Sequence, residues 1–101
     1  MHEGSAVYYV VSVETQFASM DEVVAKAPQE LAAHVARSKA LHAGGSLLLA
    51  GAFIHEPERP LSTMAICPSC EAANEYISGD PFVQRGMVRS WSIRGWHNLF
   101  A

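Results

Sequence analysis

One stretch of the sequence, residues 27–51, constrains the fold most, because it contains a helix, the end of that helix and the segment that follows. It reads APQELAAHVARSKALHAGGSLLLAG. Pro28 suits a first helical turn, where its missing N–H is no loss. Gly44 and Gly45 follow the last residues of the helical pattern, where a left-handed backbone commonly closes a helix. The stretch therefore predicts a helix over residues 28–43.

One side of this predicted helix gathers apolar and histidine side chains. At about 100° per residue, the residues that share it are Leu31, His34, Val35, Ser38, Leu41 and His42. A histidine within an apolar stripe must find partners for its ring nitrogens or be neutral and locally satisfied. His34 is therefore the first candidate functional residue. His42 lies in the last turn, where we expect it to balance the negative end of the helix.

The remaining elements are predicted from apolar patterning and from cap residues. Runs that favour strands cover residues 6–13, 47–54, 61–67 and 89–96. Ser19 with Glu22 forms a capping box before a short helix, and Ser69 can cap a second one that Gly79 ends. Asp80 followed by a proline suits the start of one more helical turn. The order is βαββαβ, which predicts an α+β, ferredoxin-like antiparallel sheet with both main helices on one face.

Composition limits the organisation and the partners. A chain of 101 residues is expected to be a single domain, residues 1–101. Half of its residues are hydrophobic, and the first two strand runs are apolar at nearly every position, so the sheet face without helices needs a cover. Two sheets meeting face to face would provide it, as in a homodimeric α+β barrel. The net charge of −3 and the absence of a Lys/Arg cluster argue against binding to nucleic acid or an anionic membrane.

Two further features bear on location. The longest apolar run, at residues 47–54, is far shorter than the ~20 residues that span a bilayer, which favours a buried strand. The first residues, MHEGSA, carry no basic region before the first strand run, so we expect no signal peptide and a cytoplasmic location.

With these elements placed, the sequence resembles the YCII-related family, small dimeric α+β-barrel proteins, over residues 7–96. The matching features are His34, the run LHAGGSLLLAG, Ser62 with Thr63, the SCEAA helix start and the DPFVQRG segment. The resemblance implies that His34 and Asp80 are a catalytic pair. It also implies proton transfer on small ring compounds in catabolic pathways, as in a chlorinated-hydroquinone dehydrochlorinase and the similarly folded muconolactone isomerases. Two places depart from the family pattern, the cysteines at 67 and 70 and the Gly95-Trp96 ending.

The residues themselves leave two readings of this pair open. A general acid/base needs a group that titrates near neutrality and a second group that fixes its tautomer, and His34 oriented by Asp80 would meet both needs. In the alternative reading, His34 is a packed core histidine and Asp80 is only the cap before Pro81. We also predict substrate contacts from three residues, namely Arg94, Ser62 and Tyr9. Arg94 would clamp a carboxylate, although it also suits a solvated edge strand.

The two cysteines form a single Cys-x-x-Cys. This spacing at a helix start occurs in redox dithiols, but Cys67 and Cys70 also suit a role as small apolar residues, which we favour. Zinc is not expected, because one pair of cysteines lacks the other two ligands unless His55 or His97 supplies them. No cofactor or metal is predicted.

These observations lead to two hypotheses of different classes. The first is a small cofactor-independent acid/base enzyme, a lyase or isomerase acting on a small cyclic or carboxylate-bearing metabolite. The second is a non-catalytic dimer that binds a small molecule or serves as an accessory subunit. The sequence does not identify the substrate.

Overall fold

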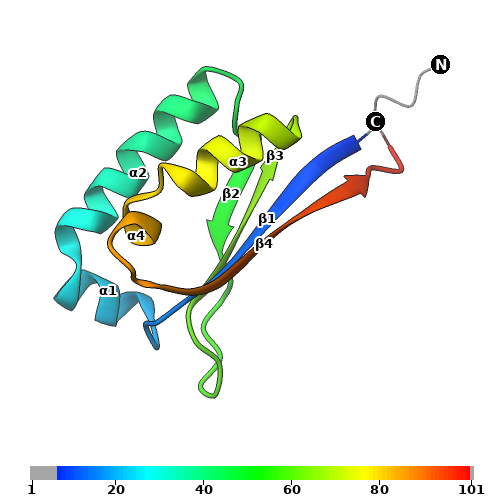
Figure 1. The fold of residues 1–101 in the computed structure, drawn as a ribbon. Coiled ribbons are helices and arrows are strands. Elements are labelled where there is room, and N and C mark those ends of the chain that lie inside the picture. The colour runs from blue at the N-terminus through cyan, green and yellow to red at the C-terminus, as the bar shows by residue number, and fades with distance from the viewer. Residues whose placement is uncertain (1–6, 101) are drawn as a thin grey trace.

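The computed structural model describes residues 7–100, which form four strands and four helices (Figure 1). The strands are β1 (Val7–Thr15), β2 (Leu49–Ala52), β3 (Ser62–Cys67) and β4 (Val88–His97). The helices are α1 (Met20–Lys26), α2 (Pro28–Ala43), α3 (Cys70–Ser78) and α4 (Pro81–Gln84). The predicted order of strands and main helices is confirmed, and the chain has an α+β, ferredoxin-like fold.

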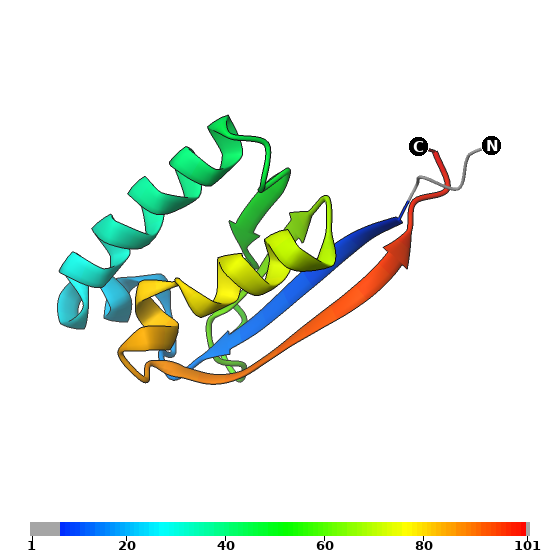
Figure 2. The same cartoon turned by 45° about the horizontal axis from the view of Figure 1, so that its top comes forward.

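The strands form one antiparallel sheet in the order β2-β3-β1-β4. In its centre Val11 of β1 lies opposite Ala65 of β3 and Ile93 of β4, and all three side chains belong to the core beneath the helices. Figures 1 and 2 show α2 and α3 over the same face of the sheet, as predicted. Because side chains alternate along a strand, every second residue of β1, such as Val10, faces the opposite way.

Polar caps and glycines start and end the helices where the sequence predicts. Ser19 accepts a hydrogen bond from the backbone N–H of Glu22 and so caps α1. Ser69 does the same for the first turn of α3. At the end of α2 only Gly45 adopts the left-handed backbone, with a φ of 86°, while Gly44 stays right-handed.

Two clusters of buried apolar side chains join the helices to the sheet. The first lies between α3 and the central strands and includes Val11, Cys67 and Ala73. The second lies near α1 and α4, where the rings of Phe17 and Phe82 meet edge to face with centroids 6.3 Å apart. Among the described residues, no helix is long and apolar enough to cross a membrane.

Helix α2 packs less closely than its apolar stripe predicts. None of its residues is buried, and Val35 is 41% exposed. Leu41 packs against the first cluster and Leu31 against the second. The predicted face is therefore correct at the two leucines, while a cleft separates much of the rest of α2 from β2.

Strand β2 is shorter and more exposed than predicted. It covers Leu49–Ala52 instead of residues 47–54, and all four of its residues are exposed. The prediction of a buried strand is wrong because β2 pairs only with β3 and forms an edge of the sheet. Phe53 and Ile54, which follow it, are also exposed, and only Leu47 from this apolar run enters the core.

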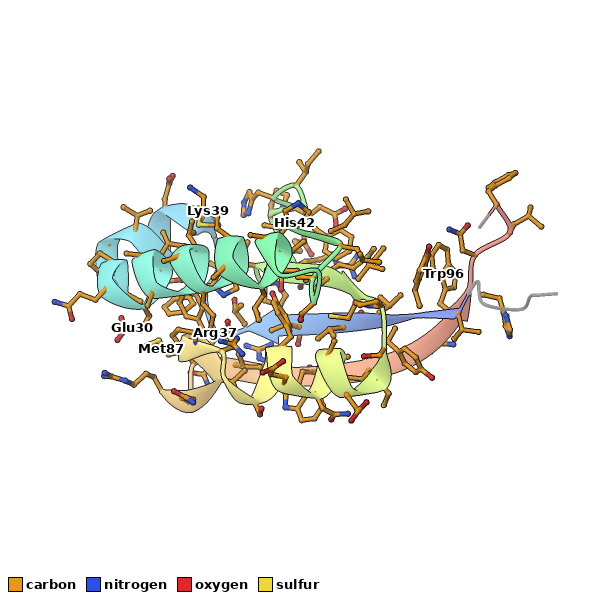
Figure 3. All side chains as sticks on the ribbon, turned by 90° about the horizontal axis from the view of Figure 1, so that it is seen from above. Glu30, Arg37, Lys39, His42, Met87 and Trp96 are labelled. Carbon is orange, nitrogen blue, oxygen red and sulfur yellow. The ribbon has the colours of Figure 1, made fainter. Side chains whose placement is uncertain are left out.

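The sheet face away from the helices carries a row of apolar side chains. Val10 of β1 lies on this face beside Ile66 of β3, which in turn pairs with the exposed Leu49 of β2. No helix covers this face in Figures 1 and 2. Trp96 lies where β4 extends beyond the helices (Figure 3). Apolar surface of this kind usually marks an interface, so we propose that a second copy of the chain covers it.

A single charge on this face tests the proposed dimer. Met64 lies on the sheet face away from the helices. It is paired with Ser12, and it is next to Ala65, which points to the helices. Met64→Glu would bury a charge in the interface, so light scattering should give one chain mass for this variant and two for the wild type. Val24→Glu, on the exposed surface of α1, is the matched control and should remain dimeric. A wild-type monomer at micromolar concentration would contradict the proposal.

Candidate functional site

Asp80 lies at the junction between α3 and α4. Gly79 ends α3, and Pro81 occupies the first turn of α4. The Oδ2 atom of Asp80 accepts hydrogen bonds from the backbone N–H groups of Phe82, at 3.1 Å, and Val83, at 3.3 Å. The Asp80 side chain is only 8% exposed. The residue is therefore a buried N-cap, which fixes the direction of its carboxylate.

The other carboxylate oxygen of Asp80 contacts His34 from α2. The distance from His34 Nδ1 to Asp80 Oδ1 is 2.5 Å. An ionised carboxylate only accepts hydrogen bonds, so Nδ1 carries the proton that it donates. The Nε2 atom makes no hydrogen bond to any residue in the range 7–100. The contact thus fixes the orientation and tautomer of the imidazole and leaves Nε2 able to exchange a proton.

His34 lies in the wall of a cleft between α2 and β2. The cleft has a volume of about 480 Å³, within the range of small-molecule sites. The residues of α2 that line it are Leu31, His34, Val35, Ser38, Lys39 and His42. The opposite wall is the apolar run at residues 47–52. None of the described residues that line the cleft is acidic. A second cavity, of about 50 Å³, is lined by both His34 and Asp80.

Tyr76 of α3 lines both cavities and approaches the imidazole edge to face, with ring centroids 6.5 Å apart. Burial raises the pKa of Tyr76 to about 12, and the nearby Asp80 carboxylate acts in the same direction. The phenol therefore stays neutral across the physiological range. A neutral phenol beside the cleft is a hydrogen-bond donor that carries no charge.

Arg37 connects α2, which carries His34, to the last turn of α3, which leads to Asp80. Its Nη1 atom donates to the carbonyl of Tyr76 at 2.9 Å, and Nη2 donates to that of Glu75 at 2.7 Å. Figure 3 shows Arg37 on the side of α2 that faces α3. These carbonyls belong to the last turn of α3, shortly before the chain reaches Asp80. Because His34 lies one turn earlier on α2, Arg37 holds together the two segments that bring His34 and Asp80 into contact.

The structure does not bring the other predicted site residues to this pair. Arg94 lies opposite Val10 and so points to the sheet face away from the helices. Ser62 also points away from the helices, and its hydroxyl donates to the Pro60 carbonyl at 3.2 Å. Tyr9 faces the helices but packs against the first core cluster, outside the residues that line the cleft. Within one chain these three residues therefore lie apart from His34, and their contact with a substrate stays a prediction.

The two cysteines occupy different environments. Cys67 is fully buried in the first core cluster, and burial raises the pKa of its thiol, which disfavours the reactive thiolate. Cys70 is exposed in the first turn of α3, and both thiols are free. The environment of Cys67 fits the packing role that we favoured. Among residues 7–100, no three His, Cys, Asp or Glu side chains gather as metal ligands.

Thr63 and Tyr76 are among the residues of the cleft that were not singled out from the sequence. Thr63 lines the cleft, whereas its neighbour Ser62 was the residue predicted to contact a substrate. The alternation of Thr63 with Ala65 and Cys67, which point to the helices, is the signal that would have identified it. Tyr76 looks like an ordinary apolar position of α3 in the sequence, and only the structure places it beside His34.

Comparison with known proteins agrees with this fold. A model of the YCII-related domain matches residues 7–97. The chain is similar in structure to 5-chloro-2-hydroxyhydroquinone dehydrochlorinase from Burkholderia phenoliruptrix AC1100, solved with 2,5-dihydroxybenzoquinone. The TM-score is 0.64 at 15% identity, covering 90% of this chain and 94% of that one. No curated protein matches the sequence.

Two further solved structures have the same fold. One is a conserved protein from Methanosarcina mazei Go1, with a TM-score of 0.60 at 13% identity, covering 97% of this chain and 99% of that chain. The other is a putative antibiotic biosynthesis monooxygenase from Caulobacter crescentus CB15, with a TM-score of 0.54 at 14% identity, covering 92% and 89%. Neighbours of this chain are dimeric α+β-barrel proteins, so the sheet and helices have the arrangement of a subunit of such a barrel.

Gly79 and Arg37 should be energetically coupled. A Cβ at position 79 would lie 2.7 Å from Arg37 Cζ and closer still to Nη2, so Gly79→Ala must displace the guanidinium. The hydrogen bonds to Glu75 and Tyr76 would then be lost, as they are in Arg37→Ala. We expect each change to lower the free energy of unfolding by roughly 1.5–3 kcal/mol, as measured by denaturant titration.

The double variant identifies the cause. Because both single changes remove the same two hydrogen bonds, Arg37→Ala with Gly79→Ala should be scarcely less stable than either variant alone. Fully additive losses would show that Gly79 acts through its backbone and not through Arg37.

Proposed function

The chain belongs to the YCII-related domain family, and we propose that it is a small acid/base enzyme, a lyase or isomerase, with His34 as the group that transfers the proton. Its substrate would be a small cyclic or carboxylate-bearing metabolite bound in the cleft between α2 and β2. The observation that carries this proposal is the 2.5 Å contact between His34 Nδ1 and Asp80 Oδ1 in the wall of that cleft.

In the proposed mechanism, Nε2 of His34 accepts a proton from a C–H or O–H group of the substrate. The imidazolium that forms is stabilised by the Asp80 carboxylate, which keeps its two hydrogen bonds to the backbone of α4. Nε2 then returns the proton to another atom, which completes an isomerisation. If a leaving group departs with its electron pair instead, Nε2 gives its proton to that group or to water, and the reaction is an elimination. Asp80 is the positioning residue, and the proposal requires no cofactor.

The surroundings of His34 support a ring-shaped or otherwise apolar substrate. The imidazole packs against Phe82, with ring centroids 5.4 Å apart, and the wall opposite α2 is apolar. The neutral phenol of Tyr76 lies near the pair, and the Asp80 charge contributes to its raised pKa. Such a site binds an apolar body and leaves a few polar groups to orient it.

A protein of the same fold fits the proposed class of chemistry. The name of the Burkholderia phenoliruptrix enzyme describes removal of hydrogen chloride from a substituted hydroquinone. At 15% identity this likeness shows the fold alone. It motivates the choice of test compounds, and the proposal itself rests on the residues of this cleft.

The proposal predicts the effects of three substitutions. A panel of chlorinated hydroquinones and unsaturated lactones is incubated with the wild type in D₂O, and turnover or proton exchange is followed by NMR. His34→Ala should reduce the rate on any active compound by about 10²–10⁴, the usual contribution of positioned acid–base catalysis. His34→Asn retains a hydrogen-bond donor for Asp80 but has no Nε2, so it should reduce the rate as much as His34→Ala does. Asp80→Asn should reduce the rate by the same factor or by less, because asparagine still caps α4.

Lys26→Gln, on the exposed surface of α1, is the control and should retain full activity. Circular dichroism and light scattering show whether each variant keeps its fold and oligomeric state. If His34→Asn turns over substrate like the wild type, His34 is a packing residue. In that case, or if no compound on the panel reacts, the non-catalytic binding or accessory dimer replaces the enzyme.

A further inference from the structure

In His42, as in His34, the Nδ1 atom is hydrogen-bonded to an oxygen acceptor. His42 lies at the other end of the cleft. Its Nδ1 atom lies 2.7 Å from the carbonyl oxygen of Leu47. A carbonyl oxygen only accepts, so Nδ1 of His42 carries the proton, and Nε2 is the nitrogen left for other partners. Both histidines line the cleft. The cleft therefore has two imidazoles that each carry a proton on Nδ1.

The two histidines are joined by a row of polar groups along α2. His34, Ser38 and His42 are four residues apart in turn, so they share one side of the helix, and the row is about 12 Å long. Lys39 lies three residues before His42 and also lines the cleft. Figure 3 shows Lys39 and His42 on the same side of α2, away from Arg37. One end of the row thus holds the paired His34, and the other holds a cation beside an imidazole.

These two residues are not required to cap α2. The last carbonyls of the helix already accept backbone hydrogen bonds, Ala40 from Gly44, Leu41 from Ser46 and His42 from Gly45. The imidazole of His42 is directed to a residue beyond the helix, and none of the described residues that line the cleft offers Lys39 a carboxylate. The chain carries a net charge of −3, but Lys39 is the one Lys, Arg, Asp or Glu residue among the described residues that line the cleft.

We propose that Lys39 and His42 form an anion-recognition site that orients the substrate in the cleft, in which His42 binds as the imidazolium and donates Nδ1–H to the Leu47 carbonyl and Nε2–H to the anion. The ligand is then a carboxylate with a compact apolar body. Its acidic group lies at Lys39 and His42, its apolar part lies against residues 47–52, and its reactive part is directed towards His34. Only one end of the cleft has this cation, so the charge fixes which end of the substrate reaches His34. This inference rests on the proposed function, because it takes the cleft as the substrate site.

The test measures binding of benzoate, of the neutral benzamide and of acetate by NMR titration of the imidazole resonances. Benzoate has the acidic group and the apolar body, so it should bind about tenfold more tightly than either of the others. Lys39→Gln and His42→Asn should each weaken benzoate binding by about tenfold. His42→Asn retains an N–H for the Leu47 carbonyl and loses Nε2, so it separates ligand binding from the structural role of the ring. Lys26→Gln removes the same charge outside the cleft and should bind benzoate like the wild type.

The outcomes separate this inference from the proposed function. His34→Asn should still bind benzoate, so binding survives in a variant that is expected to lose turnover. If that variant loses benzoate binding while the Lys39 and His42 variants keep it, the anion lies at His34 and the inference is wrong. Equal affinity for benzoate and benzamide, no benzoate binding at millimolar concentration, or an effect at only one of Lys39 and His42 would also overturn the proposed pair.

Discussion

One carboxylate, that of Asp80, performs two structural tasks on which the candidate site depends. Its Oδ2 atom caps α4, and its Oδ1 atom contacts His34 of α2. Hydrogen bonds to charged groups contribute about 1.5–3 kcal/mol each, whereas an unsatisfied buried carboxylate is costly. The cap therefore holds the oxygen that faces His34 in a fixed direction. The two readings that the sequence left open, a cap or a histidine partner, describe two oxygens of the same group.

Helix α2 is attached to the rest of the chain at its leucines and through polar contacts. Leu31 and Leu41 reach the two core clusters, and His34, Arg37 and His42 hydrogen-bond to segments outside the helix. This mode of attachment explains how a helix with no buried residue is held in one place. It also leaves space between α2 and β2, and that space is the cleft. A helix packed along its whole apolar face would have closed it.

Local signals in the sequence predict the elements well, and they predict the site only in part. Caps such as Ser19, Ser69 and Asp80 act on backbone groups a few residues away, so each can be recognised from neighbouring residues. The facing of a strand depends instead on register, and a shift of one residue exchanges the two faces. For this reason Ser62 was selected where Thr63 lines the cleft. The edge position of β2 follows from the strand order, which the apolar run at residues 47–54 does not encode.

The central claim is that Asp80 fixes His34 as the Nδ1–H tautomer and leaves Nε2 free to exchange a proton. The most direct measurement is the tautomer itself, from ¹⁵N NMR of the imidazole nitrogens under conditions where the ring is neutral. We expect the proton of His34 on Nδ1 in the wild type, and a mixture of both tautomers in Asp80→Ala. A wild-type His34 with its proton on Nε2, unchanged when Asp80 is replaced, would contradict the account.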